Sequence, residues 1–132
     1  MPAKTLELLE WPRLVHHLST FTQTKLGSLV AQQLVPPNAL AESLHLLQQT
    51  QEVVELESHV NSSLSFDGVQ DIGPALARVS IQGVLNGFEL LHIATTLSAA
   101  RQLRRTVDRF SELVNLNELV SDLRTFPELE QE

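Results

Sequence analysis

The sequence feature that most constrains the fold is a long apolar repeat that follows Asn86. Apolar residues recur at alternating spacings of three and four from Leu90 to Val114, and this spacing is typical of one face of an α-helix. The segment Asn86-Gly-Phe-Glu89 has the pattern of a capping box, in which Asn86 caps the helix and Glu89 bonds back to the cap. The sequence therefore predicts a helix of roughly 25 residues after Asn86.

The rest of the chain also favours helices over strands. Only 5% of its 132 residues are aromatic, none is Tyr, and Leu and Ala are abundant. Asn38 is the expected cap of another long helix, and Thr5 and Thr24 are expected caps of shorter ones. Helices are predicted over 6–10, 12–19, 24–34, 38–58, 74–79 and 117–124. The prediction is an all-α bundle of about five to seven helices with one long helix after Asn86.

Apolar side chains on the first three longer helices are expected to face a core, because they follow helical spacing. They are Trp11, Leu14, Val15 and Leu18, then Leu26, Leu29, Val30 and Leu34, and then Leu40, Leu44, Leu47, Val54 and Leu56. The range 60–86 is richer in Gly, Ser and Asn and reads as a connector around the short helix 74–79.

Length and composition bound the class of protein. A chain of 132 residues suits a single domain, predicted here as 1–132. The net charge of −7 argues against a basic surface that grips nucleic acid along its whole length. Zero Cys excludes disulfides and thiolate sites, and no apolar run reaches the ~20 residues of a transmembrane helix. The absence of a signal-type apolar stretch predicts a cytoplasmic protein without a membrane partner. Apolar residues that continue to Leu129 suggest a fragment of a longer chain.

A search for catalytic or metal-binding patterns finds none, so we expect no enzyme activity, metal or cofactor in this chain. It has no P-loop, dinucleotide-binding, zinc-protease or serine-hydrolase motif. His16 and His17 are adjacent, so on a helix they point about 100° apart and cannot bind one metal ion together. Asp67 and Asp71 are best interpreted as a turn former and a helix N-terminal charge. The acidic residues Glu52, Glu55 and Glu57 are expected to form a solvated face.

One candidate binding site remains, a cluster of four arginines on the long helix. Residues 101–109 carry four basic groups and one acidic group, a net +3, whereas 1–100 and 110–132 each carry −5. Arg101, Arg105 and Arg109 are spaced by four, so they would share one stripe with Arg104 beside it. The stripe can contact a phosphate backbone or an acidic partner. The alternative is an exposed face whose arginines form ion pairs with acidic residues of the same chain, for example with Asp108.

Several segments resemble the N-terminal region of bacterial MutS paralogues of the type II lineage. They are Leu64-Ser-Phe-Asp-Gly-Val-Gln-Asp-Ile-Gly-Pro-Ala-Leu-Ala-Arg78, Gly83-Val-Leu-Asn-Gly-Phe-Glu-Leu90 and Ala99-Ala-Arg-Gln-Leu-Arg104. Two earlier segments, Thr5-Leu-Glu-Leu-Leu-Glu-Trp-Pro-Arg-Leu14 and Thr24-Lys-Leu-Gly27, are similar to the first helices of that family. The resemblance extends over essentially the whole chain. At Val79 the sequence departs from the small residue expected there.

The resemblance implies a role within a larger machine. Members of this family are similar to dimeric ATPases that clamp nucleic acid and end in an Smr endonuclease domain, and they are associated with suppressing recombination and with rescuing stalled or collided ribosomes. The implied partners are downstream MutS-like domains, a second copy of the parent, and DNA or the ribosome; ATP and Mg²⁺ would bind in the parent's ATPase domain. This chain would be part of the non-catalytic core and lever region. The alternative is a stand-alone helical adaptor that binds another protein.

Overall fold

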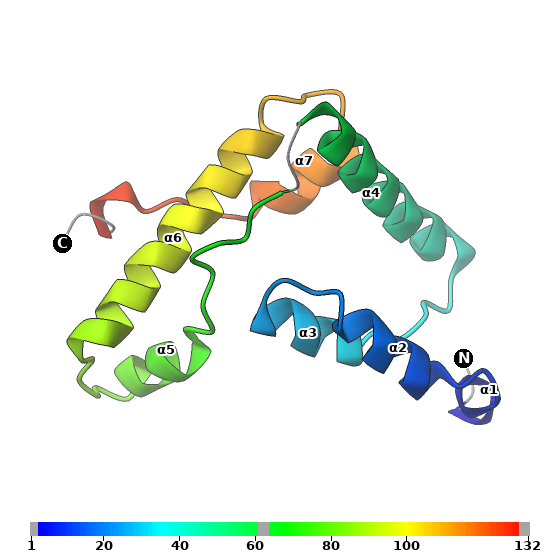
Figure 1. Ribbon diagram of the computed structural model, residues 1–132, viewed down its shortest axis with the longest axis horizontal. Coiled ribbons are helices and arrows are strands. Elements are labelled where there is room, and N and C mark those ends of the chain that lie inside the picture. Colours follow the sequence, from blue (N-terminus) through cyan, green and yellow to red (C-terminus); the bar gives the residue numbers. More distant parts are fainter. Residues whose placement is uncertain (1–2, 61–63, 130–132) are drawn as a thin grey trace. The chain divides into compact units, whose positions relative to one another are not determined.

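A computed structural model describes residues 3–60 and 64–129. All regular structure in these ranges is helical (Figure 1): α1 (Ala3–Leu8), α2 (Trp11–Ser19), α3 (Lys25–Gln32), α4 (Leu40–His59), α5 (Gly73–Ser80), α6 (Gly87–Val107), α7 (Val114–Ser121) and a 3₁₀ turn, η1 (Pro127–Leu129). The all-α prediction, the number of helices and the long helix after Asn86 are confirmed. None of the helices in the described ranges combines the length and apolar character needed to span a membrane.

The chain divides into two compact units, Met1–Thr50 and Gln51–Glu132, and the boundary falls within α4. We refer to them as the N-terminal unit and the C-terminal unit and describe each by itself. That residues 1–132 form one domain stays a prediction.

The N-terminal unit is built around a helical hairpin of α2 and α3, which lie side by side (Figure 1). Thr24 caps α3 as predicted, since its hydroxyl accepts a hydrogen bond of 2.9 Å from the backbone N–H of Gly27. The Trp11 indole N–H donates to the Leu34 carbonyl at 2.8 Å and ties the start of α2 to the chain after α3. The hairpin therefore combines a local cap at Thr24 with a hydrogen bond between residues 23 positions apart.

Little apolar surface is buried in this unit. Its buried side chains are Val15, Ala31 and the polar Ser19. The prediction that the apolar stripes of α2, α3 and the first half of α4 face a core is largely wrong in this structure. Val15 is buried and Trp11 half-buried, but the other predicted inward residues are 39–75% exposed: Leu14, Leu18, Leu26, Leu29, Val30, Leu34, Leu40, Leu44 and Leu47. The reason is that a two-helix hairpin covers only one side of each helix, and nothing in the described unit covers the rest.

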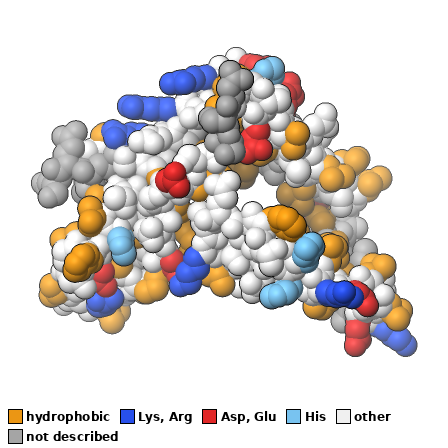
Figure 2. Space-filling view, in the orientation of Figure 1, with side chains coloured by type: hydrophobic (Ala, Val, Ile, Leu, Met, Phe, Trp, Pro, Cys, Tyr) orange, Lys and Arg blue, Asp and Glu red, His pale blue; other side chains and the backbone are white. Residues whose placement is uncertain are grey.

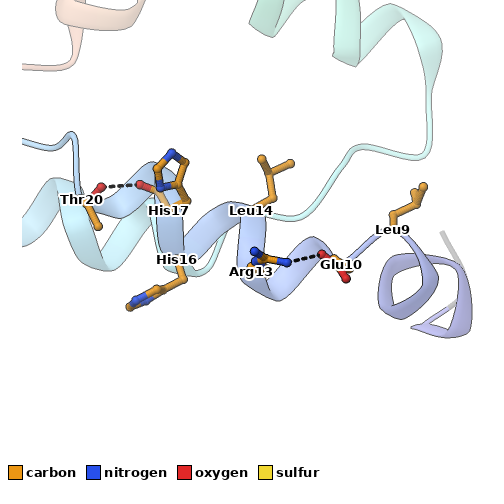
Figure 3. Close-up of a pocket in the computed structure, with 7 residues that line it drawn as sticks. All are labelled: Leu9, Glu10, Arg13, Leu14, His16, His17 and Thr20. Carbon is orange, nitrogen blue, oxygen red and sulfur yellow. Dashed lines mark hydrogen bonds and ion pairs between the residues drawn. The ribbon is translucent and has the colours of Figure 1, made fainter.

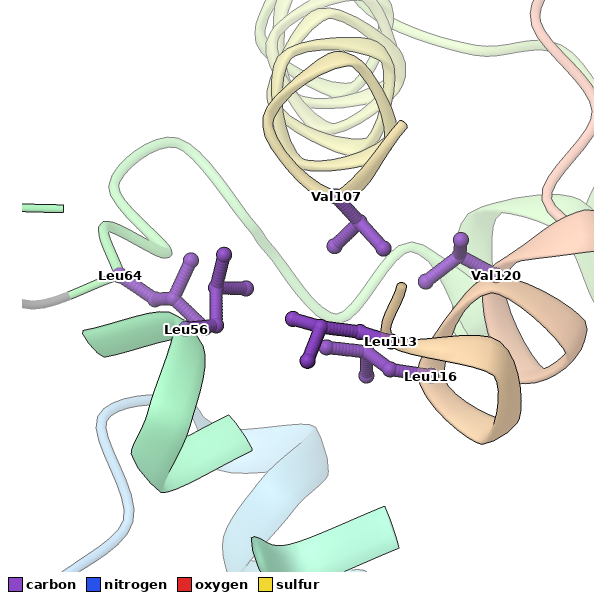
Figure 4. Packing of buried hydrophobic residues seen from close by; sticks show 6 residues of the cluster. All are labelled: Leu56, Leu64, Val107, Leu113, Leu116 and Val120. Atoms are coloured by element: carbon purple, nitrogen blue, oxygen red, sulfur yellow. The ribbon is translucent and has the colours of Figure 1, made fainter. Parts of the chain in front are cut away.

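The C-terminal unit has a well-formed core where α4, α6 and α7 meet (Figure 4). Six apolar residues from these helices and the adjoining segments form it: Leu56, Leu64, Val107, Leu113, Leu116 and Val120. Leu56 is completely buried, as predicted, whereas Val54 two positions earlier is 64% exposed. Because Leu56 and Leu116 are 60 positions apart in the sequence, this core depends on tertiary contacts.

The corner between α5 and α6 is fixed by charged and backbone hydrogen bonds. The capping box is present: the Asn86 side chain accepts from the Glu89 N–H, and the Glu89 carboxylate accepts from the Asn86 N–H, both at 3.0 Å. Arg78 donates to both carboxylate oxygens of Glu89, at 2.5 and 3.2 Å. A Cβ on Gly83 would lie 2.5 Å from Cγ of Arg78, so this close turn requires glycine.

Several helix boundaries differ from the predictions. The long helix α6 has 21 residues and ends at Val107, so the apolar spacing that continues to Val114 does not mark one helix. The chain reverses after Val107, which allows Leu113 to pack in the same core, and α7 begins at Val114 rather than 117. At the N-terminus α1 begins at Ala3, so Thr5 lies within the helix instead of capping it. Helix α4 begins at Leu40, two residues after the predicted cap Asn38.

Candidate nucleic-acid or partner interface

The arginine cluster lies at the C-terminal end of α6. Arg101, Arg104 and Arg105 occupy its last two turns, and Lys and Arg side chains gather over this end of the helix in the space-filling view (Figure 2). Arg109 lies two residues beyond the end of α6, in the turn that leads to α7. The predicted stripe of three arginines on one helix face is therefore wrong for Arg109. Arg101 and Arg105 still share a face, with Arg101 half-buried and Arg105 exposed.

Arg104 takes part in the packing of the unit. Its guanidinium donates to the Leu123 carbonyl at 2.5 Å, just after the C-terminal end of α7, and lies 3.7 Å from the Asp108 carboxylate. Arg104 and Asp108 are four positions apart, so they can meet across one helical turn. This contact is the intramolecular ion pair that the sequence suggested as the alternative to a binding role. Cations near the last carbonyls of a helix are favourable because the helix dipole is negative there. Arg104 therefore joins α6 to the end of α7.

A shallow hollow of about 240 Å³ lies beside these arginines. It is lined by Arg101, Arg104, Arg105 and Asp108 of the α6 end, and by Thr125 and Pro127 of the segment after α7. Guanidinium groups present planar sets of N–H donors that match carboxylate and phosphate oxygens. Arg105 is the exposed arginine among the residues that line the hollow, and Asp108 is the acidic one.

Glu52 has a structural role that sequence reasoning missed. Its carboxylate accepts hydrogen bonds from the backbone N–H of Leu116 at 2.7 Å and of Asn115 at 3.2 Å, and from the Asn115 side-chain amide at 2.6 Å. It thereby caps the N-terminus of α7, where a carboxylate is favourable. The predicted solvated acidic face is wrong for Glu52, whereas Glu55 and Glu57 are exposed. No local pattern reveals this contact, because 63 positions separate Glu52 from Asn115.

Glu52 and Arg104 together hold α7 at both of its ends. Glu52 comes from α4 and binds the first turn, and Arg104 comes from α6 and binds beyond the last turn. We call these two residues the α7 anchor pair. The same helix α7 supplies Leu116 and Val120 to the core (Figure 4). The second half of α4, α6 and α7 are thus linked by charge-assisted hydrogen bonds as well as by apolar packing.

The other polar candidates do not form a reactive site. Asp71 accepts from the N–H of Gly73 at 3.3 Å, at the start of α5, and Asp67 lies in a turn next to Gly68, whose φ is 88°. Both agree with the interpretation as a helix N-terminal charge and a turn former. His16 and His17 project in different directions from α2 (Figure 3). In the described ranges no three His, Asp or Glu side chains lie close enough together to hold a metal ion.

Glu89 has a carboxyl whose acidity is changed by its neighbours. Its hydrogen bond from the Asn86 backbone and then its bonds from Arg78 hold the pKa of the Glu89 carboxyl below the ordinary value of 4.5. Both partners stabilise the charged form of the carboxyl, and both belong to the α5–α6 corner. This perturbed carboxyl is therefore part of the scaffold and not of the arginine cluster.

The chain is similar to curated bacterial proteins over nearly its whole length. Over 128 residues it is 51% identical to "Endonuclease MutS2" of Synechocystis sp., a match that covers 97% of this chain and 16% of that protein. Proteins of the same name from Geobacillus thermodenitrificans and Pediococcus pentosaceus are 32% and 28% identical over 100% and 99% of this chain. The chain spans about a sixth of the length of these relatives. No family model matches it, and no solved structure matches it significantly.

Proposed function

Since this chain belongs to the MutS2 family, as a segment about one sixth as long as the curated members, we propose that it is a non-catalytic structural module of a longer MutS-like protein. The observation that carries the proposal is the α7 anchor pair. Glu52 and Arg104 link the second half of α4 to the end of α6 through one short helix. Such a connection makes a stiff corner from which the 21-residue helix α6 extends.

Stiffness is the property that a transmitting element requires. A helix passes a displacement from one end to the other when its own hydrogen bonds and its end contacts stay intact. Helix α6 is fixed at its start by the capping box and Arg78, and at its end by Val107 and Arg104. We propose that α6 transmits changes of state between an ATPase domain, with its ATP and Mg²⁺, and the nucleic-acid-binding parts of the same protein.

The relatives are named as endonucleases. From the family resemblance we propose that the longer protein is an ATPase and endonuclease, works as a dimer on DNA or ribosomes, and acts in suppressing recombination or rescuing stalled ribosomes. The present 132 residues contribute mechanical support to those activities and no reacting group.

A glycine substitution that loosens α6 tests the mechanical role. His92 and Gln102 are exposed on α6, and glycine at such positions weakens a helix by about 1 kcal/mol each relative to alanine. In the full-length protein we expect His92→Gly with Gln102→Gly to reduce the stimulation of ATP hydrolysis by nucleic acid, with basal hydrolysis unchanged. The matched pair His92→Ala with Gln102→Ala should retain the stimulation. Equal stimulation in both double variants would contradict the proposal.

We propose further that the cluster Arg101, Arg104, Arg105 and Arg109 contacts phosphate or an acidic neighbouring domain. Within it Arg105 and Arg109 would make the direct contacts, because both are exposed and a hollow lies beside Arg105. The double variant Arg105→Glu with Arg109→Glu should weaken binding of the full-length protein to DNA or ribosomes. It should also reduce the slope of log affinity against log salt by about 1 per lost phosphate contact. Lys4→Glu, at an exposed lysine of α1 in the N-terminal unit, is the control. An unchanged affinity and slope would exclude the phosphate role.

A stand-alone adaptor domain is the second candidate, and the exposed apolar surface of the N-terminal unit favours it. The two candidates differ in what covers that surface. In an adaptor the cover comes from another protein, and in a module of a longer protein it comes from the same polypeptide.

A further inference from the structure

The segment that leads from the core to α5 runs beside α6 (Figure 1). Its residues 64–72 form no helix or strand, so their backbone groups lack the partners that regular structure supplies. Leu64 fixes the first end of the segment in the core, at 7% exposure. The other end continues into α5, where Arg78 binds Glu89 in the first turn of α6. We call residues 67–72, between these two fixed ends, the strap.

One side chain of α6, the hydroxyl of Thr96, binds the middle of the strap. It accepts a hydrogen bond of 3.0 Å from the backbone N–H of Gln70 and donates one of 3.3 Å to the carbonyl of Gly68. A threonine hydroxyl has one donor hydrogen and two acceptor lone pairs. A single side chain therefore satisfies one backbone donor and one backbone acceptor of the strap, 26 and 28 positions away in the sequence.

Gly68 allows the strap to approach α6 at the same point. Its φ is 88°, in the region that favours glycine. A Cβ at this position would lie 3.4 Å from the carbonyl oxygen of Thr95 and 3.8 Å from Cβ of Ala99, which is itself buried. Both the backbone conformation and the narrow space beside α6 therefore suit glycine here.

The strap has little apolar burial of its own. Between Leu64 and Ala75, which are each 7% exposed, no residue is buried, although Phe66, Val69 and Ile72 are half-buried. Segments with few buried apolar contacts and with hydrogen bonds near the surface open at a lower free energy than the core. The two hydrogen bonds of the Thr96 hydroxyl are therefore a large part of what closes the strap.

We propose that the strap is a releasable brace of α6, latched by Thr96, which opens while the core stays folded. Helix α6 is fixed at its start by the capping box and at its end by Arg104. The closed strap adds a brace in the middle, and its opening leaves the middle of the helix free to bend. Opening thus lowers the stiffness that transmission requires. The inference rests on the proposed function only in this last step, because the latch is a property of the C-terminal unit alone.

Hydrogen exchange in the full-length protein tests the latch, with two adjacent threonines as a matched pair. Thr96→Val keeps the shape of the side chain and removes the hydroxyl, so the amide of Gln70 should exchange at least about fivefold faster. Thr95→Val is the control and should leave this rate unchanged, because the Thr95 hydroxyl donates to carbonyls of α6 itself. Thr96→Ser retains a hydroxyl and should retain the parent rate. Equal exchange of Gln70 in Thr96→Val and Thr95→Val would overturn the latch.

The core amides report whether the strap opens by itself. In Thr96→Val the amides of α7, which packs in the core, should keep the exchange rates of the parent protein. If they accelerated by the same factor as Gln70, the strap would open only together with the core, and a separate strap would be overturned.

A second variant opens the strap from its own side and leaves Thr96 intact. Gly68→Ala places a Cβ at a positive φ, beside the Thr95 carbonyl, and should also accelerate exchange of Gln70. An unchanged rate would overturn the close contact between the strap and α6.

The stimulation of ATP hydrolysis by nucleic acid tests the consequence for α6. Thr96→Val should lose part of the stimulation, whereas Thr95→Val and Thr96→Ser should retain it, with basal hydrolysis unchanged in all three. Faster exchange of Gln70 with full stimulation would support the releasable strap and overturn its effect on transmission. Loss of stimulation in the α6 glycine variants, with unchanged exchange of Gln70 in Thr96→Val, would support transmission and overturn the latch.

Discussion

The two units of the chain contain the same kind of sequence but bury it to very different extents. In the C-terminal unit six apolar residues from α4, α6, α7 and the adjoining segments form one cluster, with Leu56, Leu113 and Val107 at 0–2% exposure. In the N-terminal unit the leucines of α2 and α3 follow equally good helical spacing and are 39–53% exposed. Helical periodicity therefore shows which face of a helix is apolar, but it does not show whether this chain covers that face.

The charged side chains of the two units also differ in what they bind. The ion pair of the N-terminal unit, Arg13 with Glu10, is local and has both side chains mostly exposed, at 82% and 68%. Exposed pairs of this kind contribute about 0–1 kcal/mol. In the C-terminal unit Glu52 and Arg104 bind backbone groups of distant segments at the two ends of α7. The charged side chains of the C-terminal unit thus bind backbone groups of other segments, whereas Arg13 and Glu10 bind each other within one turn.

Truncation of one leucine in each unit should give the largest difference. Leu56→Ala removes a completely buried side chain and should lower the free energy of unfolding by about 2–5 kcal/mol. Leu14→Ala removes a side chain that is 53% exposed and should change it by at most about 0.5 kcal/mol in the 132-residue chain. Urea unfolding followed by circular dichroism measures both values. Similar losses in the two variants would show that the two units are equally packed, contrary to the difference in burial described above.

Removal of the Glu52 carboxylate should have an intermediate effect. Glu52→Ala leaves the N–H groups of Asn115 and Leu116 without their acceptor at the start of α7, which we expect to lower stability by about 1–3 kcal/mol. Glu55→Ala, on the same helix, is the matched control. The Glu55 carboxylate lies 3.9 Å from exposed His59, and its removal should lower stability by about 0–0.5 kcal/mol. Thermal unfolding, together with hydrogen exchange of the α7 amides, measures both variants. Equal effects would mean that Glu52 does not anchor α7.

The smallest effect is expected from pH, through Glu89. The pKa of its carboxyl is lower in the folded protein than the ordinary 4.5, because the Asn86 N–H and Arg78 bind the charged form. The stabilisation is therefore complete above pH 4.5 and is lost as the pH falls through the lower, folded pKa. In Glu89→Gln the melting temperature should fall less steeply below pH 4.5 than in the parent chain. An identical pH profile in the two proteins would contradict the role assigned to Glu89.

Local signals in the sequence were sufficient for much of the fold. The capping box at Asn86, the Thr24 cap and the short helix after Asp71 were each predicted from residues close together in the sequence, and the structure confirms all three. The predicted resemblance to the type II MutS paralogues is confirmed by the matches. Features that depend on distant residues were missed, among them the anchoring by Glu52 and the end of α6 at Val107. The functional role of the arginine cluster stays a prediction.

The helical class, the caps and the band of positive charge at 101–109 follow from the sequence alone, because helix propensity, capping and charge depend on nearby residues. Tertiary structure decided which apolar stripes became a core and which charged residues became anchors. Leu56 and Leu14 follow similar local patterns, and only one of them has partners from distant segments. Burial depends on what the chain brings together in space, and helical spacing contains no information about that.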